Sequence, residues 1–190
     1  FNFDALQNDY RYRQLAFEEW RQLYQKGKLN AVQRQFFETR PAEALYGVEV
    51  DPHETRNLAS DPSYTKVLDE MRELMSSELR EINDLSFFPE PIMLKEAMKN
   101  PVKYGKGKSD HINKLVGIAD LQLRPYKEVQ DQIKEALISD DSWSRYWGCI
   151  VASSHRKITS EQVRLIAKIA DNDMEPLVRC RAAEFLGLTG

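Results

Sequence analysis

Histidine and carboxylate side chains can exchange protons or hold a metal, and in this sequence they meet in one short stretch. The stretch "RPAEALYGVEVDPHETRNLASDP", residues 40–62, places Asp51, His53 and Glu54 within four positions. Acid–base or metal chemistry needs such groups to converge from fixed elements. The chain holds three histidines in all, and the other two are His111 and His155. No two of them have the spacing of metal ligands, so we expect each to be structural or solvent-exposed.

The potential nucleophiles also lack a catalytic arrangement. Ser153, Ser154 and His155 are sequence neighbours, whereas catalytic triads assemble in space, and no Gly-x-Ser-x-Gly elbow occurs. Cys149 and Cys180 both lie in apolar helical patterns, which favours two buried free thiols over a disulfide bridge. We therefore expect no catalytic residue, no metal ligand and no cofactor site in this chain.

A lysine- and glycine-rich segment, "VKYGKGKSD" at residues 102–110, shares some features with phosphate-binding loops. Lys108 followed by Ser109 matches only the tail of such a loop, because the leading glycine spacing and the preceding strand are absent. The favoured interpretation is a solvated loop.

Capping rules give the stretch at residues 40–62 a structural interpretation. Asp51 is a good N-cap, Pro52 suits the first helical position, and Glu54 stands three residues after Asp51, which is a capping-box arrangement for one helical turn. Asn57 and Leu58 are expected to end that turn, with Leu58 buried. On these grounds the stretch is a rigid joint.

Residues 43–50, "EALYGVEV", form the one good strand candidate. Leu45, Val48 and Val50 are its apolar members, and Gly47 interrupts it. A single strand leaves its backbone groups unpaired. The segment therefore either completes a sheet whose other strands come from elsewhere in the protein, or it lies as an extended linker.

Helical patterns occupy the rest of the first hundred residues. An aromatic stripe predicts a first helix, and Asn30 is placed to cap a short second helix at residues 31–37. Asp61 and Pro62 begin the clearest helix, which extends to about residue 84. The stripe of the first helix consists of Tyr10, Phe17, Trp20 and Tyr24. The long helix has one continuous apolar face, expected to pack against other helices, made of Tyr64, Val67, Leu68, Met71, Leu74, Met75, Leu79 and Ile82.

Five successive helices are predicted after residue 109, at about 110–123, 126–138, 142–154, 160–170 and 176–188. The last four form two pairs: "RYWGCIVAS" from Arg145 aligns with "RCRAAEFLG" from Arg179. A repeat of helical hairpins indicates an α-solenoid. The expected fold is mainly α, with at most one or two short strands near residues 43–50. The expected domains are residues 1–100 and 101–190.

The stretch "DMEPLVRCRAAEFLGLTG" resembles the second half of a HEAT repeat. In such repeats small residues let helices approach closely, while larger apolar residues fill the space between layers. The residues assigned to repeat packing are Arg145, Trp147, Val178, Arg179, Ala182, Ala183 and Leu186.

Composition excludes two classes of protein. The net charge of −3 leaves no basic footprint for nucleic acid. No apolar run approaches the ~18 residues that a membrane-spanning helix needs. The balance of 42% hydrophobic and 30% charged residues is typical of a globular chain.

The joint also resembles the C-terminal signature of bacterial sulfatases of the alkaline-phosphatase-like superfamily. The family pattern is Arg-Pro-x-Glu-Glu-Leu-Tyr-Asp, then Asp-Pro-x-Glu-x-x-Asn-Leu-Ala. The sequence departs from it at Ala44 and Gly47. The matching residues are Arg40, Pro41, Glu43, Leu45, Tyr46, Asp51, Pro52, Glu54, Asn57, Leu58 and Ala59.

This resemblance implies a non-catalytic C-terminal portion of a sulfatase. In the family the motif belongs to a small C-terminal sheet, while a Cys/Ser-x-Pro-x-Arg nucleophile and a calcium ion lie elsewhere; this chain lacks the nucleophile motif. The implied partner is an upstream catalytic domain, with protein or glycan contact through the helical repeats. Export to the periplasm or beyond is implied too. The alternative is a stand-alone helical scaffold that binds a protein.

Overall fold

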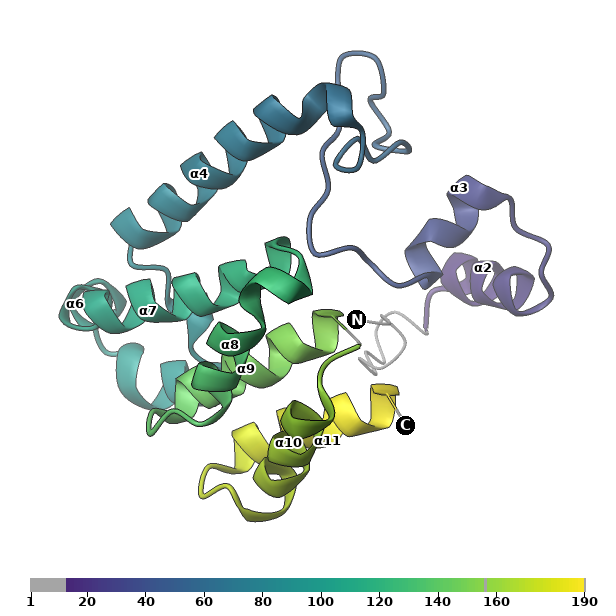
Figure 1. Cartoon of the computed structure of the whole chain (residues 1–190). Coiled ribbons are helices and arrows are strands. Elements are labelled where there is room, and N and C mark those ends of the chain that lie inside the picture. Colours follow the sequence, from purple (N-terminus) through teal and green to yellow (C-terminus); the bar gives the residue numbers. More distant parts are fainter. Residues whose placement is uncertain (1–12, 156, 190) are drawn as a thin grey trace. The chain divides into compact units, whose positions relative to one another are not determined.

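The computed structural model of the chain describes residues 13–155 and 157–189, and these residues are mainly α-helical (Figure 1). No β-strand occurs within those ranges. The mainly-α fold class predicted from helical periodicity is therefore confirmed. The chain divides into two compact units, Phe1–Thr65 and Lys66–Gly190. The domain boundary predicted near residue 100 was based on resemblance to a family, not on compactness of the chain, and it stays a prediction.

Short helices and an extended segment make up the first unit. The extended segment at residues 38–61 contains turns but no helix. The helical elements are α2 (Leu15–Gln25), α3 (Ala31–Arg34), η2 (Gln35–Phe37) and η3 (Pro62–Tyr64).

An aromatic cluster holds α2 against α3 and η2. Tyr24 stacks on Phe37 with ring centroids 4.6 Å apart, and Trp20 meets the same ring at 4.9 Å. Phe17 lies 6.0 Å from Phe37 and is buried. The predicted stripe is thus confirmed for these three residues of α2, whereas Tyr10 lies outside the described residues. Such ring pairs add to the free energy gained from burying apolar area.

Caps fix the ends of these helices, and those at Asn30 and Asp61 are the ones that the sequence predicts. Gly27 follows α2 with a φ of 64°, the left-handed conformation that glycine adopts without strain. Asn30 and Gln33 form a reciprocal capping box at the start of α3. At the start of η3, the Asp61 side chain accepts a hydrogen bond from the Ser63 backbone N–H at 3.0 Å.

Nearly all of the second unit is helical. Its elements are α4 (Thr65–Glu81, which begins at the unit boundary), η4 (Leu85–Phe87), α5 (Glu90–Ile92), η5 (Met93–Ala97), α6 (Pro101–Gly107), α7 (Ser109–Ala119), η6 (Asp120–Leu123), α8 (Tyr126–Leu137), α9 (Ser142–His155), α10 (Ser160–Asn172) and α11 (Pro176–Thr189).

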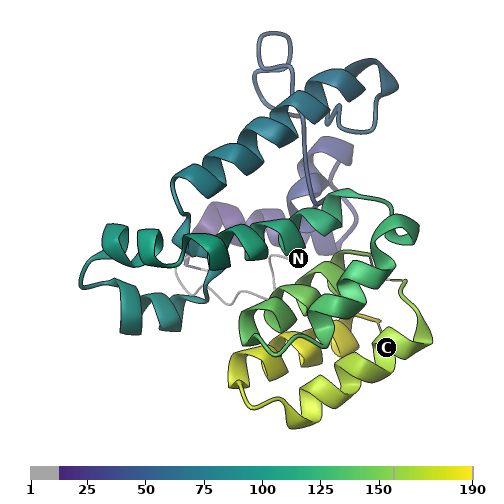
Figure 2. The ribbon, with the colours of Figure 1, turned by 60° about the vertical axis from the view of Figure 1, so that its left-hand side comes forward.

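Helices α7 to α11, with η6 continuing α7, confirm the five predicted helices to within a few residues. Figures 1 and 2 both show α8 beside α9 and α10 beside α11. Alternate helices also meet, α9 with α7 and α11, and α8 with α10. Helices α8–α11 therefore enclose one core, and its fully buried members include Ile133, Ile166, Val178 and Phe185. The buried residues of α7 form a second cluster with Phe87 and Phe88. This is the arrangement of a helical repeat fold.

A glycine allows α9 to lie close to α8. A Cβ atom on Gly148 would come within 3.2 Å of both the Ala136 Cβ and the Leu137 backbone nitrogen. Backbone atoms cannot move aside as a flexible side chain can, so any larger residue at position 148 would push the two helices apart.

A buried polar network ties α8 to α10. The Tyr126 hydroxyl donates to Gln162 Oε1 at 2.7 Å and accepts from the Thr159 N–H at 2.9 Å. Gln162, 2% exposed, also donates to the Gln130 carbonyl at 2.6 Å. The Thr159 side chain caps α10 by accepting from the Gln162 N–H, while the Gln162 side chain bonds to α8.

The segment predicted to be a solvated loop is helix α6 and the start of α7. Asn100 accepts a hydrogen bond from the Lys103 N–H at 3.0 Å, and Pro101 occupies the first helical position. Gly105 is buried because the helix lies close to the end of α4, where an added Cβ would meet the Asn83 carbonyl oxygen at 3.2 Å. The cap and this close contact outweigh the low helix propensity of glycine.

The apolar face of α4 is mostly exposed. The sequence pattern predicts a face packed against other helices, yet Leu68 is the buried residue of α4. Four residues on one side of the helix, which we name the α4 stripe, are between 42% and 62% exposed: Val67, Met71, Leu74 and Met75. Several neighbouring exposed apolar side chains are typical of a surface that another element covers.

Candidate functional site

The Asp51 carboxylate organises the turn that follows it. It accepts hydrogen bonds from the Thr55 hydroxyl at 3.0 Å and from the Arg56 N–H at 2.8 Å. The bonds from Arg56 and Thr55 hold the pKa of Asp51 below its usual value, so the carboxylate stays ionised. His53 and Glu54 are exposed beside it. These contacts give Asp51 a structural role.

The predicted capping box at Asp51 is wrong in its geometry. Residues 51–54 form a turn closed by the Glu54 N–H on the Asp51 carbonyl at 3.0 Å, and no helical turn forms. Glu54 has a φ of 53°, outside the helical region. The Asp51 N–H bonds to the Gly47 carbonyl at 2.9 Å. The Asp51 carboxylate therefore accepts hydrogen bonds from the residues that follow the turn, Thr55 and Arg56.

Asn57 supplies hydrogen-bond partners to the strand candidate at residues 43–50. Its Oδ1 accepts from the Leu45 N–H at 3.0 Å and from the Ala59 N–H at 2.9 Å. Its Nδ2 donates to the Glu43 carbonyl at 3.4 Å, and the Leu58 N–H donates to the Leu45 carbonyl at 2.8 Å. The segment is thus extended without forming a strand among the described residues, and Leu45 and Leu58 are buried.

Other signature residues lie around this joint. The Arg40 guanidinium lies over the Phe36 ring at 5.9 Å, a cation–π contact. Pro41 and Pro52 are exposed, and Tyr46 is half-buried. The joint therefore combines a small apolar contact with backbone hydrogen bonds, and its residues do not converge on a reactive centre.

An ion pair joins Arg145 of α9 to Asp173, the residue that follows the end of α10. Arg145 meets the Asp173 carboxylate through two nitrogens, at 2.6 and 2.9 Å, and also donates to the Ser139 carbonyl at 2.7 Å. Arg179 donates to the Asp173 carbonyl at 2.6 Å. Burial works to raise the pKa of Asp173, but the bonds from Arg145 and the Glu175 N–H, with the nearby arginine charges, together outweigh it and hold that pKa below its usual value.

The structure places the other repeat residues in different environments. Val178 and Ala182 are fully buried and Leu186 packs at the edge of the core. Trp147 packs on the Phe87 ring and donates its indole N–H to the Phe87 carbonyl at 2.8 Å. Ala183, in contrast, is exposed, because it lies on the face of α11 opposite the core.

The two cysteines, both predicted to be buried, differ in their exposure. Cys149 is buried, and that burial raises the pKa of its thiol to about 12, so it remains protonated. Cys180 is exposed, because it points outward from α11 two residues after Val178. Both are free thiols, as predicted.

One Ser, one His and one Asp do meet in the second unit. The Ser144 hydroxyl donates to Asp141 Oδ2 at 2.6 Å, and His111 Nε2 lies 3.0 Å from the same oxygen. A catalytic triad requires the serine to bond to the histidine, whereas here both bond to the aspartate. Ser144 is also fully buried. Burial works to raise the pKa of Asp141, but the bonds from Ser144 and His111 outweigh it and lower the pKa.

His155 is partly buried at the end of α9, where its Nε2 lies 3.3 Å from the Leu121 carbonyl. Burial lowers the pKa of this histidine, which favours the neutral ring.

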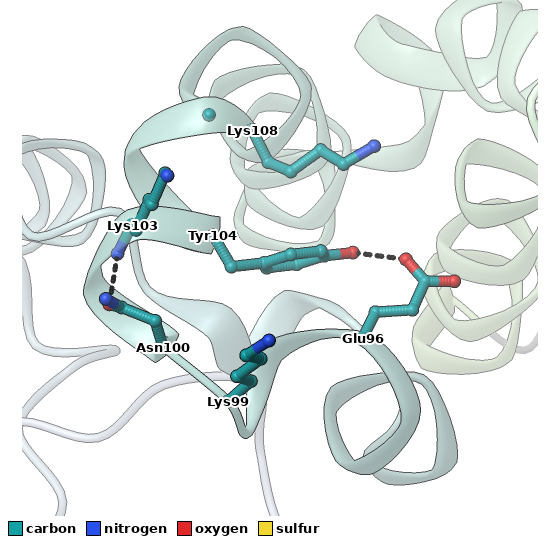
Figure 3. A pocket seen from close by; sticks show the side chains of 7 residues that line it. Glu96, Lys99, Asn100, Lys103, Tyr104 and Lys108 are labelled. Carbon is teal, nitrogen blue, oxygen red and sulfur yellow. Dashed lines mark hydrogen bonds between the residues drawn. The ribbon is translucent and has the colours of Figure 1, made fainter.

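A hollow of about 570 Å³ in the second unit is lined by α6, the turn before it and Glu96 of η5 (Figure 3). Tyr104 lies at its centre and donates its hydroxyl to Glu96 Oε2 at 2.8 Å. Lys99, Lys103 and Lys108 surround it. In the sequence, Lys103 and Lys108 stand out only as part of a possible phosphate loop. The missed signal was charge density, because residues 93–108 contain five lysines and one glutamate.

A second hollow, about 640 Å³, lies between α7 and α8. Lys114, Glu135 and Asp140 line it together with apolar side chains. Its charges have both signs, so it favours no class of ligand by electrostatics.

Metal-ligating side chains do not cluster in the described part of the chain. Within residues 13–155 and 157–189, no group of three or more His, Cys, Asp or Glu side chains is placed to hold a metal ion. No helix in these ranges is long and apolar enough to cross a membrane.

Comparison with known proteins links part of the chain to sulfatases. The chain is similar to an ulvan-active sulfatase of Formosa agariphila, with 39% identity over 83 residues. The match covers 43% of this chain and 14% of that sulfatase. No family model and no solved structure matches the chain. The chain therefore contains a sulfatase-related region.

Proposed function

We propose that this chain is the non-catalytic C-terminal portion of a sulfatase, which supports the catalytic domain and presents a helical surface to a partner. The observation that carries this proposal is the 39% identity to a sulfatase. The signature residues Asp51 and Asn57 add support, because their side chains organise the joint through backbone hydrogen bonds.

Hydrolysis of sulfate esters belongs, in this proposal, to the catalytic domain. That domain would supply the Cys/Ser-x-Pro-x-Arg nucleophile and the calcium ligands that the family resemblance implies. Export to the periplasm or the medium, the assignment of α8–α11 to HEAT repeats, and a glycan or protein partner for those helices belong to the same proposal.

The α4 stripe is the part of this chain that we assign to contact with the catalytic domain. Its side chains are exposed although their spacing puts them on one side of a 17-residue helix. Burying four such side chains against another domain would contribute about 1 kcal/mol or more for each one. The match to a sulfatase supports the choice of a sulfatase catalytic domain as the element that would cover them.

The test joins this chain to a sulfatase catalytic domain and compares Met71→Ser/Met75→Ser with Lys66→Ser/Glu70→Ser. The control pair lies on the same helix and leaves the net charge unchanged. The methionine variant is expected to lower the thermal midpoint and the aryl sulfate hydrolysis of the joined protein, but not the stability of this chain alone. Equal behaviour of the two variants in the joined protein would overturn the assignment of the stripe.

The isolated chain is expected to release no sulfate from an aryl sulfate. Measurable and saturable sulfate release by the purified 190-residue chain would overturn the non-catalytic assignment.

A stand-alone helical scaffold is the competing proposal. The observation that favours it is the core of α8–α11, which buries its large apolar residues within this chain. If this chain failed to stabilise any sulfatase catalytic domain, the scaffold would become the preferred function.

A further inference from the structure

Lysine side chains line the hollow around Tyr104 without acidic partners. Of the described ion pairs, none involves Lys99, Lys103 or Lys108. Glu96 is the one acidic residue among those lining the hollow, and its carboxylate accepts the Tyr104 hydroxyl. The lining therefore has an excess of positive charge, in a chain whose net charge is −3.

The Tyr104 ring is held in one orientation. Its hydroxyl is fixed on Glu96, its edge contacts the Phe88 ring at a centroid distance of 6.1 Å, and the Lys108 ammonium lies 5.8 Å from its centroid. Figure 3 shows the Lys108 side chain extended along the ring. Burial, together with the Glu96 bond, raises the pKa of Tyr104 to about 12, so the phenol is neutral at physiological pH. A neutral, oriented ring beside cations is a good apolar platform.

The capped start of α6 keeps this arrangement in place. Asn100 and Pro101 fix the first turn, and Gly105 lets the helix lie against the end of α4. Because Lys103 and Tyr104 stand on that helix and Lys99 on the turn before it, the cations stay close to the ring. The hollow of about 570 Å³ falls within the range of about 300–1,000 Å³ typical of ligand sites.

We propose that this hollow binds an acidic polysaccharide, with the Tyr104 ring against the apolar face of a sugar and the lysine ammonium groups on its sulfate or carboxylate groups. Lysine is a compact point charge on a flexible stem, which suits anionic groups at variable positions. The choice of a polysaccharide rests on the proposed sulfatase function. Nucleic acid offers the same charge, but the acidic balance of the whole chain disfavours it.

The test measures binding of the 190-residue chain, with no catalytic domain present, to four probes by isothermal titration calorimetry. The probes are dextran sulfate, polygalacturonate, neutral dextran and a single-stranded oligonucleotide. Dextran sulfate tests sulfate groups and polygalacturonate tests carboxylates. We expect one or both acidic polysaccharides to bind, more weakly at high salt, and neutral dextran not to bind. Binding of neither acidic polysaccharide would overturn the proposal.

Two triple variants separate the hollow from general surface charge. Lys99→Gln/Lys103→Gln/Lys108→Gln is expected to weaken binding about tenfold, the size expected when three exposed charge contacts are lost together. The matched control, Lys127→Gln/Lys157→Gln/Lys168→Gln, removes three exposed lysines from other elements and is expected to leave binding unchanged. Equal weakening by both triples would show that the hollow is not the binding site.

Variants of Tyr104 test the platform. Tyr104→Ala is expected to weaken polysaccharide binding several-fold, while Tyr104→Phe retains the ring and most of the binding; circular dichroism checks that both variants are folded. Unchanged binding in a folded Tyr104→Ala variant would refute the platform. Tighter binding of the oligonucleotide than of either acidic polysaccharide would refute the choice of ligand. Because these measurements use the chain without a catalytic domain, their outcome does not depend on the outcome of the α4 stripe test.

Discussion

The helices α8–α11 and the joint at residues 40–62 are held together by different forces. In the helices, large side chains such as Ile133, Ile166 and Phe185 are completely buried, and polar contacts such as Arg145 with Asp173 bridge the layers. In the joint, Leu45 and Leu58 are the buried apolar residues, and side chains bond directly to backbone groups. The helices are therefore stabilised mainly by packing, and the joint mainly by hydrogen bonds.

This difference shows which part of the chain carries its own stability. Apolar burial scales with area and accumulates over many residues, whereas single exposed hydrogen bonds each contribute little. We expect the helices to fold cooperatively by themselves and the joint to open locally at a much lower free energy. Substitutions in the two regions test that contrast.

The largest effect is expected from Phe185→Ala in the helical core. Removing this fully buried ring leaves a cavity between α11 and its neighbours and should lower the free energy of unfolding by about 4 kcal/mol. Urea denaturation followed by circular dichroism measures the loss. The control Leu188→Ala, on the same helix but 61% exposed, should change stability by less than about 0.5 kcal/mol. A loss below about 1 kcal/mol for Phe185→Ala would contradict a packed core.

A smaller effect is expected from Asp173→Asn, which breaks the pair with Arg145. The variant should lower the free energy of unfolding at pH 7 by about 2–3 kcal/mol, because a poorly solvated arginine loses its charged partner. The pKa of Asp173 is lower in the folded chain than its ordinary 3.8, so its stabilisation is complete above about pH 4 and is lost as pH falls through the folded pKa.

Measuring the free energy of unfolding as a function of pH distinguishes the Arg145–Asp173 pair from other acidic residues. Below about pH 4 the wild type should lose stability more steeply than Asp173→Asn, since the variant has no such group to protonate. Asp171→Asn, an exposed neighbour on α10, is the matched control and should follow the wild type. Parallel curves for wild type and Asp173→Asn would show that the pair adds nothing to acid sensitivity.

The smallest effect is expected from Asn57→Ala in the joint. The change removes the acceptor of the Leu45 and Ala59 N–H groups and should weaken local stability by about 1–2 kcal/mol. Amide hydrogen exchange at Leu45 should then become about 5- to 30-fold faster while exchange in α8–α11 stays unchanged. Arg56→Ala, whose side chain is 76% exposed, is the control. Equal acceleration in both regions would show that joint and helices unfold together.

Sequence periodicity predicted the helices well because their caps and apolar faces are local. Asn30 caps α3, and Asp61 caps η3, which leads directly into the long helix α4. Val178 and Ala182, which were assigned to packing from resemblance to a HEAT repeat, are buried, and the exposure of Ala183 shows that a small residue alone does not indicate a helix contact.

Features that depend on distant residues could not be predicted in this way. The Asp51 carboxylate accepts from Thr55 and Arg56, four and five residues ahead, so a three-residue capping rule gave the wrong partner. Helix α6 forms despite two glycines because Gly105 lies against Asn83, a contact that no local pattern contains. The hollow around Tyr104 arises from that helix and was therefore missed as a site.

The hydrogen-bond network of Tyr126, Gln162 and Gln130 constrains how this array of helices can change in length. Apolar surfaces of similar shape can slide or exchange partners, but a buried amide must find matching donors and acceptors at every new position. Insertion of another hairpin between α9 and α10 would separate Gln162 from Tyr126 and leave both without their bonds. New hairpins can therefore be added to this chain at the outer end of the array more readily than within it.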